Sequence, residues 1–124
     1  MSSKFETISR SAEHRYTYSR ILGGAGEFAT VSIRTDPLPR GSGVQFLDAS
    51  TGGSVPKRFV EGVKQGIVEA ATTTGVIGGS QITDLLVTLV DGAYHEVDSS
   101  PHAFSLAAQA AFREAVRKAG PILI

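Results

Sequence analysis

The segment from Leu85 to Lys118 constrains the fold most, because its pattern indicates a strand, a short polar loop and a helix. Residues 85–90 are apolar except for Thr88 and are rich in branched side chains, which is typical of a mostly buried strand. Asp91-Gly92 predicts the end of that strand. Ser99-Ser100-Pro101 predicts a helix start, since a serine cap accepts a bond from a free amide and proline has no amide to satisfy.

The predicted helix has one apolar face and a defined end. Gly120-Pro121 stops it, and Arg113, Arg117 and Lys118 lie near the negative end of its dipole. The residues that form the apolar face recur at helical spacing: Phe104, Ala107, Ala108, Ala111, Phe112 and Ala115. The loop between strand and helix, residues 94–98, is therefore held between two rigid elements. It carries a histidine and two carboxylates, so any function is sought there first.

Composition narrows the class of protein. The 124 residues are enough for one domain with its own core. The chain has no cysteine, which excludes disulfides and thiolate metal sites. Its formal net charge is zero, which argues against a nucleic-acid binder that relies on a large basic field. No apolar run approaches the ~20 residues of a membrane span, so we expect a soluble, cytoplasmic domain without membrane contact.

The first half of the chain shows mainly strand patterns. The glycine-rich stretch Gly23–Gly26 predicts a turn that joins two alternating segments into a hairpin. Tyr16 and Tyr18 would give the first of these strands an aromatic face, and we interpret them as packing residues rather than base-stacking platforms. An exposed connection is expected over 36–43. The strands predicted in this half lie at 5–8, about 15–21, 29–34 and 44–48.

A first helix is predicted from about Pro56. Gly62 and Gly66 lie one turn apart inside it, although each costs about 1 kcal/mol of helix propensity relative to alanine. Close packing of the helix against the sheet is the expected compensation. Its apolar stripe consists of Phe59, Val63, Ile67 and Ala70. Together these patterns predict an α+β two-layer sandwich, with a mainly antiparallel sheet and two helices on one face.

Catalytic motifs are weak in this chain. The stretch Gly24–Ala29 formally matches a dinucleotide fingerprint, but a strand pattern follows it instead of the required helix, and no P-loop is present. The three histidines, His14, His95 and His102, share no metal-ligand spacing.

The loop after the second buried strand leaves two interpretations open. His95, with Glu96 or Asp98, could supply acid-base groups, and Ser99 a nucleophile. Alternatively, Asp98 and Ser99 serve the helix start and His95 is a solvated loop residue. An interaction surface made of polar loop contacts is the third possibility.

Four blocks of sequence carry a resemblance to a known family. They are residues 23–28, 37–43, 52–57 and 87–100, and they occur in the order found in domain IV of elongation factor G. The ending, residues 112–123, also resembles that family. The likeness begins at about Phe5, so residues 1–4 are interpreted as a lead-in and 5–124 as the domain.

The resemblance implies a fold and a larger protein. The fold would be like the second domain of ribosomal protein S5: a four-stranded, mostly antiparallel sheet with two helices on one face and a left-handed βαβ crossover. General handedness rules would favour the opposite hand. The resemblance also implies that the chain is a monomeric, non-catalytic fragment of a translational GTPase, whose other domains would be its intramolecular partners. GTP and magnesium would bind in an N-terminal domain absent here, and this chain would need no cofactor.

The resemblance further implies a site at two tip loops, residues 20–26 and 91–99. In the family, this tip enters the decoding region of the small ribosomal subunit and contacts the tRNA–mRNA duplex during translocation. His95 aligns with the tip histidine, whose role resembles contact with the RNA backbone. The residues that would contact the ribosome are Arg20, Gly23, Gly24, Gly26, Tyr94, His95, Glu96, Asp98 and Ser99.

The first tip loop departs from the family pattern. Ile21-Leu22 stands where the family has a glutamine and a small hydroxyl residue, and Ala25 stands where it often has an arginine. Two apolar side chains cannot replace those hydrogen bonds. The departure implies a divergent paralogue with altered translocation or recycling duties, or one related to ribosome-protection proteins. The alternative is a stand-alone RNA- or protein-interaction module of the same fold.

Overall fold

The computed structural model describes residues 5–23, 25–73 and 81–124. The predicted lead-in 1–4 and Gly24 therefore lie outside the described residues. The elements in chain order are β1 (Phe5–Ile8), β2 (Ala12–Leu22), β3 (Ala25–Pro37), β4 (Val44–Asp48), α1 (Lys57–Thr73), β5 (Gln81–Ile82), β6 (Leu85–Ala93), α2 (Pro101–Lys118) and β7 (Pro121–Leu123).

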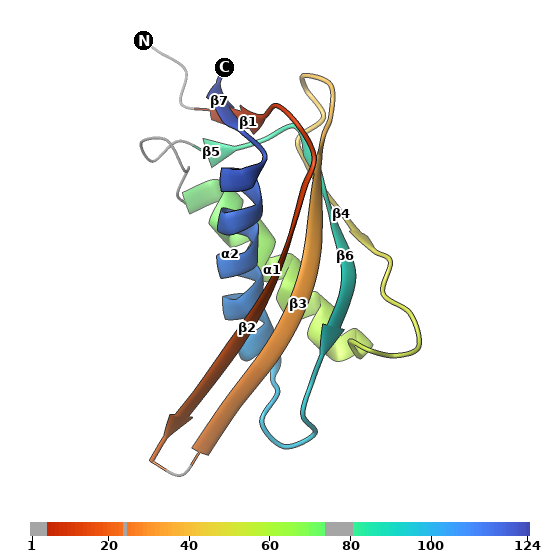
Figure 1. The fold of residues 1–124 in the computed structure, drawn as a ribbon, viewed down its shortest axis with the longest axis vertical. Helices are drawn as coiled ribbons and strands as arrows, with labels where there is room; N and C mark the ends of the chain where they lie inside the picture. Colours follow the sequence, from red (N-terminus) through yellow and green to blue (C-terminus); the bar gives the residue numbers. More distant parts are fainter. Residues whose placement is uncertain (1–4, 24, 74–80) are drawn as a thin grey trace.

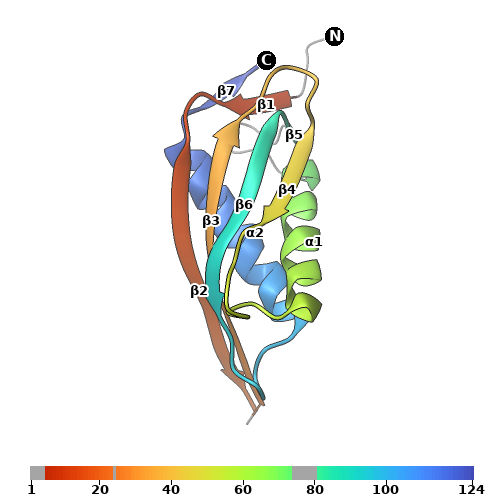
Figure 2. The same ribbon diagram turned by 90° about the vertical axis from the view of Figure 1, so that its right-hand side faces the viewer.

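The main sheet has four strands in the order β2-β3-β6-β4. The β2–β3 and β3–β6 pairs are antiparallel and the β4–β6 pair is parallel. Figures 1 and 2 show α1 and α2 side by side on one face of this sheet. In Figure 2 both β4 and β6 run downward in front of the helices, and the chain passes from β4 through α1 leftward to β6, so the crossover is left-handed. The expected two-layer α+β fold is confirmed.

A second, smaller sheet was not predicted. It contains three short strands in the order β5-β1-β7 and lies at the end of the molecule where β7 finishes (Figure 1). β1 agrees with the strand predicted at 5–8. β7 follows the second helix and spans only Pro121–Leu123, too short to show any periodicity.

The core fills the space between the helices and the main sheet. All the residues predicted for the apolar faces of the two helices are buried, together with inward-facing residues of β3 and β6. Phe59 of α1 stacks on Phe104 of α2 with ring centroids 5.0 Å apart. The helical periods read from the sequence therefore identified the core-facing sides correctly.

The prediction that Gly62 and Gly66 allow close packing of the first helix against the sheet is wrong. A Cβ on Gly62 would lie 2.3 Å from the carbonyl oxygen of Pro101, and one on Gly66 would lie 2.3 Å from that of Ser105. Both neighbours belong to the backbone of α2 and not to the sheet. The glycines therefore let the two helices approach each other within their layer. We call this contact the glycine seam.

Two strand ends also differ from the prediction. Asp91-Gly92 does not end β6, because the strand continues to Ala93 after a register shift that leaves Val90 without a partner opposite Ser32 and Ile33. Gly92 is buried, and a Cβ there would lie 2.5 Å from the carbonyl oxygen of Thr30. A glycine thus allows close strand approach here instead of a turn. Gly26 likewise belongs to β3 and pairs with Ile21.

Candidate functional site

The two predicted tip loops lie at the same end of the molecule, opposite β1 and β7 (Figure 1). One is the turn of the β2–β3 hairpin, where Leu22 pairs with Ala25 and Gly23 has a φ of +55°. The other is the segment 94–100 between β6 and α2. We call these two segments together the tip. Residues from positions about 70 apart in the sequence therefore meet at this end.

The start of α2 is capped by Ser100 alone. Its side chain accepts a hydrogen bond from the Ala103 amide at 3.0 Å, and Pro101 occupies the first turn, as predicted. The interpretation that Asp98 and Ser99 serve the helix start is therefore wrong. Both residues contact the hairpin.

Hydrogen bonds join the loop to Phe28 of β3. The Phe28 amide donates to the carbonyl of Asp98 at 3.0 Å. The Ser99 hydroxyl donates to the Phe28 carbonyl at 2.6 Å and accepts from the His95 amide at 2.9 Å. The imidazole of His95 also lies against the Phe28 ring, with centroids 4.3 Å apart. We call these four contacts the Phe28 clasp.

Gly26 completes the contact on the hairpin side. A Cβ there would lie 2.7 Å from Oδ2 of Asp98, so the Asp98 carboxylate occupies the space that a side chain would need. This observation gives Gly26 a role in the tip that differs from the predicted turn.

The other predicted residues divide between the core and the solvent. Tyr94 is half-buried, packs against the core and has its ring 5.9 Å from that of Phe59. Arg20, His95 and Glu96 are exposed. Two aliphatic side chains share this exposure, Ile21 at 79% and Val97 at 91%.

Sequence reasoning missed Phe28 as a member of the site. It belongs to a strand, and nothing in the alternation of apolar and polar residues marks a contact with a loop about 70 positions later. Val97 was within the loop but was not singled out. An apolar residue between Glu96 and Asp98 in a polar loop was the available signal.

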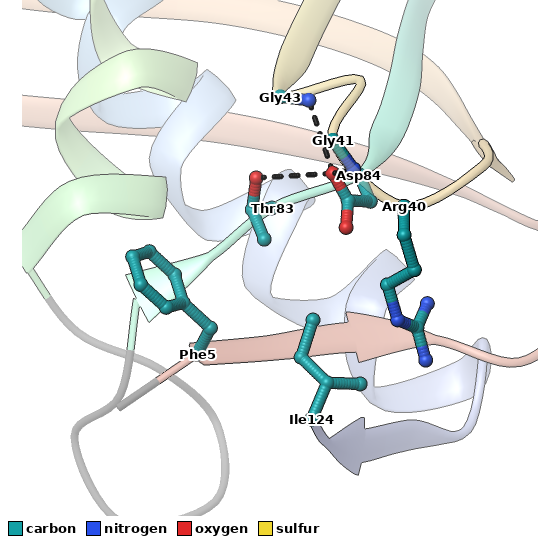
Figure 3. A pocket seen from close by; sticks show the side chains of 7 residues that line it. All are labelled: Phe5, Arg40, Gly41, Gly43, Thr83, Asp84 and Ile124. Atoms are coloured by element: carbon teal, nitrogen blue, oxygen red, sulfur yellow. Dashed lines mark hydrogen bonds between the residues drawn. The ribbon is translucent and has the colours of Figure 1, made fainter. Parts of the chain in front are cut away.

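The structure gives no support to acid-base catalysis at His95. His95 and Glu96 are exposed, whereas general acids and bases act in enclosed sites where pKa values can be shifted. Three hollows in the described part of the chain have volumes of about 440, 490 and 500 Å³, and they are lined by residues other than His95 and Glu96. The first lies at the opposite end, between Phe5, Asp84 and Ile124 (Figure 3), and the other two lie along the helices.

Two absences hold for the described residues. No group of three or more histidine, aspartate or glutamate side chains among them is placed to hold a metal ion. No helix in that part of the chain has the length and apolar character needed to cross a membrane.

Comparison with known proteins gives a consistent result. The family model of elongation factor G, domain IV, matches residues 3–120. Elongation factor G of Anaplasma marginale (strain Florida) and that of Ehrlichia ruminantium (strain Welgevonden) are each 51% identical over 119 residues. Those residues make up 96% of this chain but only 17% of either relative, so the chain spans about a sixth of their length.

A solved structure agrees with the sequence comparisons. A crystal structure of a protein from Thermus thermophilus superimposes with a TM-score of 0.89 at 37% identity. The match covers 95% of this chain and 17% of that protein. The chain belongs to the elongation factor G family, and it corresponds to domain IV.

Proposed function

We propose that the tip is the working end of a non-catalytic domain in a translational GTPase. It enters the decoding region of the small ribosomal subunit and contacts the tRNA–mRNA duplex while the duplex moves. The observation that supports this proposal most is the meeting of the two tip segments at one narrow end, with His95 exposed on it. The three hollows described above are lined by residues outside the tip.

The chemistry of the tip suits recognition of RNA shape. Double-stranded RNA is bound mainly through ribose hydroxyls and phosphates rather than base edges. An exposed imidazole can donate to such oxygens, and the start of α2 adds positive potential beside it. Arg20, on the hairpin next to the tip, is outnumbered by Glu27, Glu96 and Asp98, so the tip and the adjoining hairpin residues have no excess positive charge. We therefore expect its contacts to depend weakly on salt.

The energy for movement comes, in this proposal, from another part of the longer protein. GTP and magnesium bind there, and this domain transmits force to the duplex without forming or breaking bonds. The protein acts as a monomer in the cytoplasm, where the ribosome and the other domains of the same chain are its partners. This chain covers only 17% of the length of its relative, so most of that relative's length is available for such domains.

Replacing His95 in the full-length protein tests this proposal. We expect His95→Ala to slow translocation about tenfold, because one or two hydrogen bonds to RNA are lost at about 1 kcal/mol or slightly more each. The rate of ribosome-stimulated GTP hydrolysis should stay within about twofold of the wild-type rate. His102→Ala is the matched control, since His102 is also exposed but lies on α2 outside the tip contacts. Equal loss of translocation and hydrolysis would contradict the proposal.

A further inference from the structure

We propose that Phe28 is a positioning residue for His95: it holds the second tip segment against the hairpin and fixes the face that the imidazole presents. The functional part of this inference depends on the role proposed above for His95. The structural part depends only on the Phe28 clasp.

Phe28 lies at a point where β3 has a neighbouring strand on one edge only. On that edge β3 pairs with β2 from Ala25 to Thr35, and Phe28 lies opposite Ser19. On the other edge its pairing with β6 begins only at Thr30, opposite Ala93. The Phe28 amide and carbonyl therefore lie beyond the end of β6, where no strand supplies their partners.

The second tip segment satisfies both of these groups. The Asp98 carbonyl accepts from the Phe28 amide, and the Ser99 hydroxyl donates to the Phe28 carbonyl. The segment thus replaces β6 at the edge of β3. The segment is held through the amide and carbonyl of Phe28, the same backbone groups that a neighbouring strand would use.

Ser99 extends this hold to His95. Its hydroxyl accepts from the His95 amide while it donates to Phe28, so one hydroxyl connects the two residues. The Ser99 amide returns a bond to the His95 carbonyl at 3.1 Å. The amide and the carbonyl of His95 are therefore both bonded to Ser99, which is itself bonded to Phe28.

The Phe28 ring restricts the His95 side chain as well. An exposed histidine normally samples several rotamers and loses that freedom when it binds. Here the imidazole lies against the Phe28 ring, with centroids 4.3 Å apart and planes inclined by 34°. The contact selects one orientation before RNA is met. Phe28 therefore acts through His95 without being required to touch the RNA.

The test uses the full-length protein with four variants: Phe28→Leu, Phe28→Tyr, His95→Ala and the double variant Phe28→Leu/His95→Ala. Leucine retains the backbone amide and carbonyl and most of the apolar bulk but removes the ring that packs on the second tip segment, whereas tyrosine keeps the ring. We expect Phe28→Leu to slow translocation about three- to tenfold and Phe28→Tyr to remain within about twofold of the wild type. The double variant should be no slower than His95→Ala alone, because both changes remove the same contact.

Phe46→Leu is the matched control. Phe46 is also a partly buried strand residue, but it lies on β4, away from the tip. Phe46→Leu should lower thermal stability by about as much as Phe28→Leu does, but it should leave translocation unchanged. A translocation defect of equal size in Phe46→Leu would overturn the proposal, since the effect would then be general destabilisation.

Hydrogen exchange of the peptide covering 94–99 supplies a readout that is independent of translocation. Phe28→Leu should raise its exchange several-fold, and Phe28→Tyr should not. Unchanged exchange in Phe28→Leu overturns the proposal whatever His95→Ala does. If exchange rises but His95→Ala translocates normally, the positioning contact is supported and the function proposed for His95 is wrong. A double variant slowed by the product of the two single effects would overturn the coupling.

Discussion

The two ends of the molecule are held together by the same kind of contact but in different surroundings. At the tip, the Ser99 hydroxyl accepts a hydrogen bond from the His95 amide and donates one to the Phe28 carbonyl, so it joins two segments that are far apart in the chain. At the opposite end, Oδ1 of Asp84 accepts the amides of Gly41 and Gly43 at 3.1 and 3.0 Å (Figure 3). Each end thus depends on a side-chain oxygen, so the difference between them lies in burial.

Asp84 is buried and its contacts extend in three directions. It is 3% exposed and has a φ of +62°. Its carbonyl accepts from the Leu38 amide at 2.9 Å and from the Thr7 hydroxyl at 3.3 Å. These bonds tie β1, the connection after β3 and the start of β6 into one unit. A buried carboxylate with such partners is strongly destabilising to remove.

The tip has the opposite balance. His95 and Glu96 are exposed, and the other residues of the clasp, Phe28, Asp98 and Ser99, are only partly buried. Losing one of its bonds exposes groups that water can satisfy, so little stability is lost. The comparison indicates that the Asp84 end maintains the fold, whereas the tip contributes less to stability and maintains the shape that the proposed function requires. Changes at the two ends should therefore separate stability from function.

Replacing Asp84 should give the largest effect. Asp84→Ala leaves two amides without an acceptor and places alanine in the left-handed region, so we expect about 3 kcal/mol less stability in urea unfolding. Asp84→Asn tolerates that conformation and keeps one acceptor, and it should lose only about 1 kcal/mol. Equal losses in the two variants would show that the amides are not what Asp84 satisfies.

The glycine seam should give the next effect and should also reach the tip. Gly62→Ala brings a methyl group into the backbone of Pro101, the first residue of α2. We expect about 2 kcal/mol of destabilisation despite the better helix propensity of alanine. Faster hydrogen exchange in the neighbouring segment 94–100 should accompany it. Lys64→Ala, on the exposed side of the same helix, is the control. A stability gain in Gly62→Ala would contradict the close approach of the helices.

Removing the Ser99 hydroxyl should affect the tip with little effect on the fold. Ser99→Ala loses one donated and one accepted bond at a partly exposed site, so we expect a loss of about 1 kcal/mol or less in thermal unfolding. Exchange of the His95 amide should rise well above its rate in the wild type. Ser42→Ala is a suitable comparison, since its hydroxyl bonds the Pro39 carbonyl on an exposed turn at the other end. If Ser99→Ala matched Asp84→Ala in stability loss, the distinction between the two ends would fail.

The smallest expected effect concerns His14, which lies outside both ends. Burial lowers the pKa of His14 below its usual 6.5, the nearby Lys118 lowers it further, and Glu114 partly opposes them. The folded state therefore binds a proton less readily than the unfolded state, so stability falls as the pH drops below about 6.5. His14→Gln should reduce the fall in melting temperature between pH 7 and pH 5 by about 1 °C. A steeper fall in the variant would mean that His14 binds its proton more tightly in the folded state.

The sequence predicted best those features that repeat along the chain. Helical spacing located the buried faces of both helices, and alternation located β2 and β3. The cap at Ser100 followed from local chemistry. These features depend on neighbours within a few residues, which is why a single sequence suffices for them.

The features that could not be predicted depend on contacts between distant segments. Gly62 and Gly66 showed that something approaches α1, but spacing alone could not distinguish a sheet from a second helix. Gly92 suggested the end of a strand, because a glycine needed for close strand approach has the same local pattern. The Phe28 clasp and the β5-β1-β7 sheet join residues from opposite halves of the chain. The resemblance to elongation factor G supplied the crossover hand, which local patterns do not encode.

The most direct test compares one variant from each end in the full-length protein. For His95→Ala and Asp84→Asn, the ratio of the translocation rate to the rate of ribosome-stimulated GTP hydrolysis is measured below the melting temperature of both. We predict that the ratio falls about tenfold in His95→Ala and stays within about twofold of the wild type in Asp84→Asn. An unchanged ratio in His95→Ala, or an equal fall in both variants, would contradict the assignment of function to the tip.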